Sequence, residues 1–262
     1  MRPIDAEAAR ELAEYLPDDP FTFDARSCLF RGFAEAWILG EAHQFRAAIV
    51  RDRWQPTEPR AFGEDAVGIW MLLKEVPNWN CVNCSSSVAP ALRELMEGAL
   101  GQSAETLEDI YFVLHSPAVR NDHPSVRRLS EEDLGLVERA PSVLHPVGYD
   151  STLAALSGGI LAGAVEGGQL VALVSMTWTS ETYANLAAHT LEGWRRQGMA
   201  AAGAYLVASA AQERGLIPVW SAGANNRSSQ RVAQKLGFGE YGRRAYVIVP
   251  GLPRGSGFRP TR

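Results

Sequence analysis

Cysteine is scarce in this sequence, and it has no long apolar run. Only three cysteines occur in 262 residues, and an odd number in an otherwise ordinary composition favours a reducing cytoplasm over a disulfide framework. The longest apolar run, residues 199–211, is too short and too rich in alanine to cross a bilayer. Residues 1–16 are acidic and lack the basic and then apolar order of a signal peptide. We therefore expect a cytoplasmic protein without a membrane partner.

Positive charge is also limited. The net charge is −5. Residues 1–120 carry 11 basic and 19 acidic side chains, whereas residues 121–262 carry 14 and 11. The excess of basic over acidic side chains in residues 121–262 is too small and too dispersed for a nucleic-acid-binding face, and no nucleic-acid partner is expected. It does suit a C-terminal half that holds a small polyanion.

Motifs for nucleotide phosphates and for metals are missing or incomplete. The sequence has no G-x-x-x-x-G-K-[ST] loop and no G-x-G-x-x-G that follows a strand, which disfavours a nucleotide-phosphate enzyme. Cys81 and Cys84 have the spacing of zinc and redox sites, but only Cys28 and His43 could complete four zinc ligands. We expect Cys81 and Cys84 to be small apolar residues of a strand or loop, and we predict no metal.

Two predicted domains of mixed strands and helices are joined by a linker. Residues 116–124 contain two prolines and several polar residues, and the sign of the net charge changes there. We predict an N-terminal α+β domain over residues 1–118, a second domain over residues 124–250 and a loose tail over residues 251–262.

Local patterns predict the elements of both domains. In the first domain they are helices over residues 6–16 and 88–100 and strands over 36–39, 45–51, 66–73 and 109–114. In the second they are strands over residues 125–129, 160–165, 170–177, 183–189, 216–221 and 246–249, with helices that begin at Ser130, at Asp150 or Ser151, after residue 200 and at Asn226.

Residues 190–200 place a basic, glycine-containing turn between a predicted strand and an alanine-rich helix. Glycine lets the backbone come close to a ligand, and the first N–H groups of a helix point at an anion. Arg195 and Arg196 add positive charge at the same place. This order predicts a pocket for an anionic phosphate ester.

The second domain resembles the GNAT superfamily of acyl-CoA-dependent N-acetyltransferases. The family signature, Arg/Gln-x-x-Gly-x-Gly/Ala, is matched by residues 195–200. A second family element, Asn-x-x-Ser/Ala followed by Lys-Leu-Gly-Phe, is matched by Asn226, Ser229 and residues 235–238. The resemblance covers roughly residues 124–249. It implies an α/β fold with a mixed sheet, and the smaller N-terminal α+β domain is open to interpretation as a degenerate half-copy of it.

The resemblance implies acetyl-CoA as a cosubstrate, with the pantetheine arm on the strand before the signature and the pyrophosphate on the N–H groups of the turn. The residues that it implies in cofactor binding are Ala188, His189, Thr190, Arg195, Arg196, Gln197, Gly198, Met199, Ala200, Asn226 and Ser229. The plain alternatives are a solvated turn for the two arginines and a simple helix cap for Asn226.

The resemblance implies catalytic groups as well, but one of the family's usual groups is missing from this sequence. The family's usual acid is a tyrosine five residues before the phenylalanine of the second element, and that position is Ala233 here. The groups that would replace it are water and the side chains of Ser228, Ser229 or Tyr246. A thiol with a pKa of about 8.5 needs little help to leave. Glu181 precedes the central strand and is the candidate base, with an exposed loop acid as the alternative. His189 is a further candidate, because its pKa range is suitable, with a side chain that packs in a layer against a helix as the alternative.

The function that these features predict is transfer of an acetyl group to a primary amine of a small molecule or peptide by direct attack. The acidic N-terminal half favours a cationic amine as acceptor. The alternative is a protein that holds acyl-CoA or a partner without turnover, which Ala233 motivates. A homodimer stays open.

Overall fold

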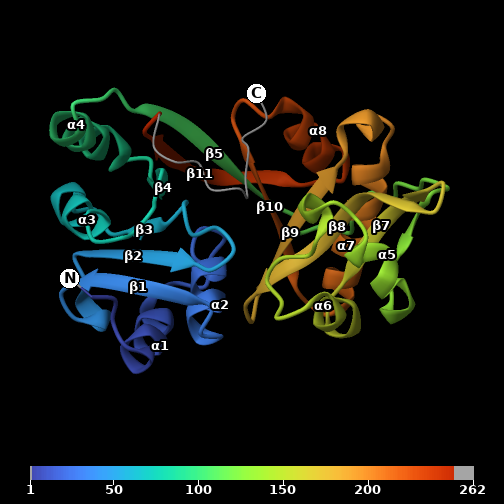
Figure 1. The fold of residues 1–262 in the computed structure, drawn as a ribbon, viewed down its shortest axis with the longest axis horizontal. Helices are drawn as coiled ribbons and strands as arrows, with labels where there is room; N and C mark the ends of the chain where they lie inside the picture. The colour runs from blue at the N-terminus through green and yellow to red at the C-terminus, as the bar shows by residue number, and fades with distance from the viewer. Residues whose placement is uncertain (1, 251–262) are drawn as a thin grey trace. The chain divides into compact units, whose positions relative to one another are not determined.

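The structure, a computed structural model, describes residues 2–250, so the tail predicted over residues 251–262 lies outside the described residues. Its eleven strands form one mixed sheet in the order β1-β2-β3-β4-β11-β5-β10-β9-β8-β7-β6 (Figure 1). The predicted α/β class with a mixed sheet is therefore confirmed. No helix within residues 2–250 combines the length and hydrophobicity needed to cross a bilayer.

The strands are β1 (Ala34–Leu39), β2 (Ala47–Asp52), β3 (Arg60–Phe62), β4 (Cys81–Ser85), β5 (Glu105–Val113), β6 (Val126–Arg128), β7 (Leu161–Glu166), β8 (Gln169–Thr179), β9 (Tyr183–Thr190), β10 (Ile217–Gly223) and β11 (Gly239–Ile248). The α-helices are α1 (Ala6–Tyr15), α2 (Phe23–Phe30), α3 (Ala66–Leu73), α4 (Ala89–Leu100), α5 (Leu134–Glu138), α6 (Thr152–Gly158), α7 (Met199–Glu213) and α8 (Arg227–Lys235).

These elements gather into two compact units. Unit 1 comprises residues 2–111, 221–226 and 242–250 of the described chain, and unit 2 comprises residues 112–220 and 227–241. β5, β10 and β11 each contribute residues to both units. The units therefore differ from the consecutive segments 1–118 and 124–250 predicted from the sequence. The reason is that β5, β10 and β11 each run from one unit into the other, and no local sequence pattern shows where a strand does so.

Several element ends have local causes in the sequence, and the predicted helix start at Ser130 is one of them. The Asp5 carboxylate accepts from the N–H groups of the first turn of α1, and α4 ends at Gly101, whose φ of 64° is left-handed. Ser130 opens a capping box, although the first turn there is a 3-10 helix. Gly167 and Gly168, both with positive φ, make the reversal between β7 and β8.

The strand predicted over residues 66–73 is wrong, because this segment is the helix α3. Its sequence, Ala-Val-Gly-Ile-Trp-Met-Leu-Leu, is apolar almost throughout, and a short apolar run has no periodicity that separates a strand from a buried helix. The helix begins where the Asp65 carboxylate accepts from the Gly68 N–H at 2.9 Å. β11 is also longer than the predicted strand over residues 246–249, since its first half is polar.

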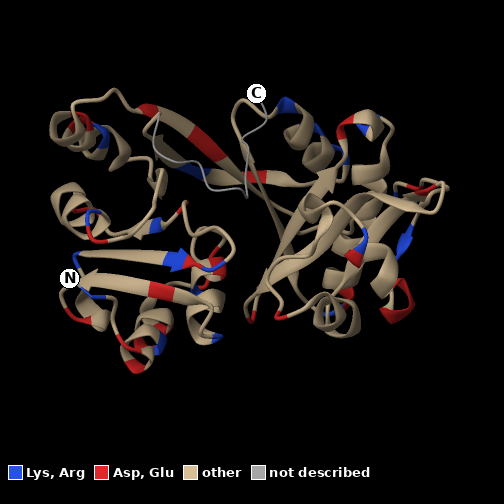
Figure 2. Ribbon diagram, in the orientation of Figure 1, with Lys and Arg blue, Asp and Glu red and all other residues tan. Residues whose placement is uncertain are grey.

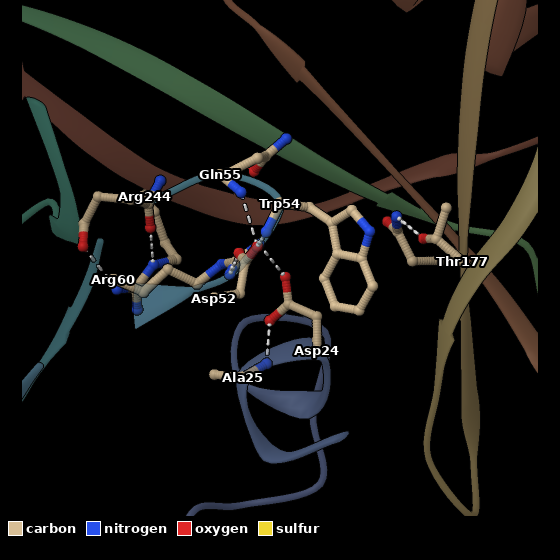
Figure 3. A network of polar contacts seen from close by, with 10 residues as sticks. Asp24, Ala25, Asp52, Trp54, Gln55, Arg60, Thr177 and Arg244 are labelled. Carbon is tan, nitrogen blue, oxygen red and sulfur yellow. Dashed lines mark hydrogen bonds and ion pairs between the residues drawn. The ribbon is translucent and has the colours of Figure 1, made fainter. Parts of the chain in front are cut away.

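A buried ionic cluster lies in unit 1 on the face of the sheet that α2 covers. Arg60 donates to Asp24 at 2.9 Å and to Asp52 at 3.1 Å (Figure 3). The second oxygen of Asp52 accepts from the N–H groups of Trp54 and Gln55, at 2.9 and 2.8 Å. Asp24 and Asp52 are 8% and 2% exposed, so their charges depend on Arg60 rather than on water.

Burial raises the pKa of Asp109, at the edge of this cluster, to about 7, although Arg60 and Arg244 act to lower it. In the unfolded chain the same carboxyl titrates near its ordinary pKa of about 3.9. Between these values the folded protein holds the proton and the unfolded chain does not, so stability decreases as the pH rises from about 4 to 7.

Asp109→Asn removes this titration, and we expect it to flatten the loss of stability over that pH range. The contribution is at most about 4 kcal/mol, at 1.36 kcal/mol per pKa unit. Urea unfolding at pH 5 and pH 7.5 measures it. Glu108→Gln is the matched control, because Glu108 is exposed and pairs with Arg243; equal slopes for Asp109→Asn and the unsubstituted protein would contradict the prediction.

In unit 2, α7 lies close against the sheet because small residues face it. A Cβ atom added at Gly203 would come within 2.8 Å of Cγ2 of Val174 on β8 and 3.9 Å of Cβ of Ala162 on β7. α7 carries no charged side chain before its last residue, Glu213, and Lys, Arg, Asp and Glu are also absent from its neighbours β8 and β9 (Figure 2). The helix is thus held by close packing.

We expect Gly203→Val to destabilise the protein by about 1–3 kcal/mol, since overpacking forces α7 away from β8. Gly98→Val is the control, because Gly98 lies inside α4 and a Cβ atom there meets nothing within 4 Å. Chemical denaturation of the two variants measures the difference. Equal stabilities would show that α7 is free to shift.

Candidate functional site

The pairing between β9 and β10 stops partway along β9. The two strands are parallel and in register over three residue pairs, the last of which joins Asn185 to Val219. β9 itself continues to Thr190, where it is still paired with β8. Beyond Leu186, the edge of β9 that faces away from β8 has no strand partner among residues 2–250, so its backbone is open to a ligand.

The alternation of hydrogen bonds shows which backbone groups lie at this open edge. Leu191 donates its N–H to the carbonyl of Val171 on the β8 side at 2.9 Å. Bonded and non-bonded pairs alternate in an antiparallel ladder, so the backbone of His189 is also directed at β8. The N–H and C=O groups of Ala188 and Thr190 are directed at the open edge, which refines the predicted set of Ala188, His189 and Thr190.

The turn between β9 and α7 contains two left-handed residues. Arg196 has φ 66° and Gly198 has φ 89°, and the non-glycine residue costs roughly 1–2 kcal/mol in this conformation. Trp194 and Met199 hold the ends of the turn in an apolar cluster, and Met199 is 2% exposed. The side chains of residues 195–198 are exposed. A strained backbone fixed at both ends and open to solvent is typical of a binding turn.

The start of α7 lacks an internal partner for its N–H groups. The first bond of the helix runs from the N–H of Ala202 to the carbonyl of Gly198, which leaves the N–H groups of residues 199–201 without a helical acceptor. No side chain caps the helix, and its first turn has no acidic residue. A Cβ atom added at Gly198 meets nothing within 4 Å. The helix N-terminus and the nearby arginines therefore suit a phosphate group.

Arg195 ties the turn back to β9. Its Nε donates to the carbonyl of Thr190 at 3.2 Å. Burial lowers the pKa of the nearby His189, and the charge of Arg195 lowers it further. His189 is half-buried and lies opposite Leu173, which packs against Leu144 and its neighbours. His189 is thus a neutral imidazole near pH 7 on the face of β9 opposite α7, and it is able to accept a proton.

The second sequence element forms the start of α8. Asn226 directly precedes this helix and donates its N–H to the carbonyl of Gly223 at 2.8 Å. The hydroxyl of Ser229 accepts from the indole N–H of Trp220 at 2.9 Å. This bond fixes the Ser229 oxygen at the C-terminal end of β10. Ala233, at the family's tyrosine position, is fully buried, so no hydroxyl is supplied from there.

The other two predicted catalytic residues lie elsewhere. Glu181 is exposed in the loop between β8 and β9, five residues or about 16 Å of strand before Leu186. Tyr246 belongs to unit 1 and lies opposite Asn83 on β4. Burial raises its pKa well above the ordinary value, and Asp109 adds to the effect. Tyr246 is therefore a neutral phenol, and Glu181 and Ser229 are the two candidates that belong to unit 2.

Sequence reasoning missed Asn185 and Thr177. Asn185 is the last residue of β9 paired with β10, and its side-chain amide donates to the hydroxyl of Thr177 at 2.7 Å (Figure 3). Thr177 lies where the register of β8 and β9 shifts after Met176. Neither a β-bulge nor the end of a strand pairing has a sequence signal strong enough to single out these residues.

A hollow of unit 2 lies away from the turn. It has a volume of about 400 Å³ and is lined by Val113, His115, Ser116, Gly237, Gly239, Glu240 and Tyr241 of unit 2. Ser116 is held at the far end of α7, where Gln212 donates to its carbonyl at 2.7 Å. The turn at the start of α7 is exposed to solvent over residues 195–198.

Comparison with known proteins gives a family match over part of the chain. Residues 154–247 match the model of the family described as GNAT acetyltransferase. This segment contains β9, the turn, α7 and α8, and thus every element of the candidate cofactor site. No curated protein matches the sequence significantly.

Solved structures match almost the whole chain. A GCN5-related N-acetyltransferase-like protein from Streptococcus suis has a TM-score of 0.68 at 21% identity, covering 93% of this chain and 99% of that one. A Drosophila protein has a TM-score of 0.64 at 16% identity, covering 95% and 98%. A tandem GNAT protein from the clavulanic acid biosynthesis pathway has a TM-score of 0.55 at 14% identity, covering 94% and 96%. At these identities the likeness is one of fold.

Proposed function

Since residues 154–247 form a GNAT acetyltransferase domain, we propose that the chain is an acetyl-CoA-dependent N-acetyltransferase that acts on a primary amine of a small molecule or peptide. The observation that carries this proposal is the open edge of β9 followed directly by the uncapped start of α7. A single ligand that reaches from the edge of β9 to the start of α7 needs amide groups to pair with the strand and a phosphate to bind the helix N-terminus. The pantetheine arm and pyrophosphate of coenzyme A have this order of groups.

Each part of the cofactor then has a partner. The N–H groups of residues 199–201 and the guanidinium of Arg196 bind the pyrophosphate. The backbone of Ala188 and the N–H of Thr190 bind the pantetheine amides, in the way that a strand is added to a sheet edge, while the carbonyl of Thr190 accepts from Arg195. The thioester would lie toward Asn185, where β9 and β10 are still paired, and a backbone N–H of the open edge would stabilise the oxyanion.

The amine is proposed to approach β9 on the face opposite α7, because two polar side chains of this strand lie there. On that face β9 carries Asn185 and His189, which are both half-buried. Neutral His189 is a better candidate for taking the ammonium proton than Glu181, which lies in the exposed loop. Direct attack on the thioester needs the amine held near it, a proton acceptor and a donor to the leaving thiolate.

Ser229 is the candidate donor to the thiolate. Its oxygen accepts from Trp220, so its own proton is directed away from the indole. We expect Ser229→Ala to lower kcat about tenfold, less than the 10²–10⁴ of a strong general acid, because a thiol leaves readily. Release of free thiol with an amine acceptor measures kcat. Ser103→Ala is the control, since Ser103 is exposed and is not a candidate donor; an unchanged kcat in Ser229→Ala would refute the role of Ser229.

The second candidate function is acyl-CoA binding without turnover, which the buried Ala233 favours. Both functions require binding of acetyl-CoA. Calorimetric titration tests this binding, and no heat at near-millimolar acetyl-CoA would refute both functions. Thiol release with a panel of primary amines then separates them. Acceleration by at least one amine supports the enzyme, and binding without acceleration by any amine supports the binding protein.

A further inference from the structure

Unit 1 repeats the order of elements that makes the candidate site in unit 2. β2 and β3 are antiparallel neighbours, as are β8 and β9, and β3 and β4 are parallel neighbours, as are β9 and β10. A helix joins the parallel strands in each case, α3 in unit 1 and α7 in unit 2, and a second helix and strand follow. The place that corresponds to the cofactor site can therefore be located in unit 1.

The parallel strands of unit 1 also separate after a short pairing. Their bridge joins Arg60 to Asn83, and the N–H of Asn83 donates to the carbonyl of Pro59 at 3.0 Å. Beyond this point β3 and β4 are no longer paired, and the guanidinium of Arg244 makes hydrogen bonds to both strands instead. Its Nη2 donates to the carbonyls of Ala61 at 2.7 Å and of Asn83 at 3.4 Å, and its Nε donates to Oδ1 of Asn83 at 2.5 Å.

Arg244 is well packed where it fills this gap. It is 6% exposed, and its guanidinium lies over the ring of Phe62 with 5.1 Å between the Cζ atom and the ring centroid. In unit 1 the Arg244 side chain thus binds the carbonyl of Ala61 directly after the last paired residue of β3. In unit 2 the side chain of Arg195 bonds to the open edge of β9 instead at the end of the strand, on Thr190.

The start of α3 is filled as well. The carboxylate of Asp65 accepts from the N–H of Gly68 at 2.9 Å and pairs with Arg46 at 3.3 Å. A Cβ atom added at Gly63 would come within 2.3 Å of the carbonyl oxygen of Arg46. At the start of α7 there is no cap, and Gly198 has open space around it. An internal anion thus occupies the helix N-terminus that an external phosphate would need.

From these contacts we infer that unit 1 is a second fold of the same kind whose cofactor slot is filled by Arg244 and Asp65, so that each chain binds a single coenzyme A, in unit 2. The inference rests on the proposed function, since it takes coenzyme A as the ligand of the open site. It assigns Arg244 a structural role, in which the guanidinium replaces the hydrogen bonds of a pantetheine arm.

Calorimetric titration of the full chain with coenzyme A tests the stoichiometry. One equivalent in the unsubstituted protein, lost in Arg196→Glu and retained with the same affinity in Asp65→Asn, is the expected result. Two equivalents, or one equivalent that survives Arg196→Glu and weakens in Asp65→Asn, would overturn the inference and leave the proposed function standing. No binding at all would overturn the proposed function, and the inference would fall with it.

A second measurement tests Arg244 directly, without coenzyme A. In Arg244→Met we expect at least tenfold faster amide hydrogen exchange over residues 61–68 and 83–85, because β3 and β4 lose the side chain that bridges them and open more often. Arg243→Met is the matched control, since the adjacent Arg243 is exposed and pairs with Glu108. If Arg244→Met does not fold, Arg244→Lys keeps the charge and loses the bridging geometry. Exchange equal to that of Arg243→Met would refute the role of Arg244.

Discussion

Gly198→Val is expected to weaken the binding of coenzyme A by about 30-fold or more. Gly198 has φ 89° at the start of α7, a conformation that costs a β-branched residue of order 1–3 kcal/mol. The new side chain also stands beside the N–H groups of residues 199–201, where the backbone and the pyrophosphate must come close. A loss of about 2–3 kcal/mol corresponds to 30- to 150-fold in Kd, and calorimetric titration measures it.

Gly215→Val is the control for backbone strain. Gly215 follows the other end of α7, has φ 78°, and also has open space around it. Both variants therefore carry a similar cost in stability, which a thermal melt will report, but only Gly198→Val changes the cofactor site. An equal loss of affinity in the two variants would mean that strain in α7, and not the turn, decides binding.

Arg60→Met is expected to destabilise the protein by about 3–5 kcal/mol, the usual cost of leaving buried charges without their partner. Asp24 and Asp52 would both lose the guanidinium that neutralises them. For a chain of this size the midpoint of thermal unfolding would fall by roughly 6–20 °C, at 2–4 °C per kcal/mol. Guanidinium chloride unfolding gives the free energy directly.

Two further variants separate the buried cluster from ordinary ion pairs. Arg120→Met removes an exposed pair with Asp122, whose side chains are 77% and 64% exposed, and should leave the stability almost unchanged, because solvent screens such pairs. Adding Asp24→Asn and Asp52→Asn to Arg60→Met should restore part of the stability, because the neutral amides need no counter-charge. A triple variant no more stable than Arg60→Met would show that the guanidinium acts through packing and not through charge.

Features encoded within a few neighbouring residues were predictable. The Asp5 cap, the capping box at Ser130 and the two-glycine reversal at residues 167–168 each depend on local backbone geometry. The turn over residues 195–200 belongs to the same class, since glycine, arginine and a helix start are adjacent in the chain. The strand predicted over residues 66–73 was wrong because an apolar run without periodicity fits a buried strand and a buried helix equally well.

The sequence by itself therefore determined the mixed α/β class and the turn before α7, because local conformation and helix capping are short-range effects. Only the tertiary structure decided where the pairing of β9 and β10 ends, that the backbone of Ala188 rather than His189 lies at the open edge, and that Arg244 fills the corresponding gap in unit 1. Arg244 and Asn83 are 161 positions apart in the sequence. Contacts over such a separation depend on how distant strands pair, and no local pattern records that.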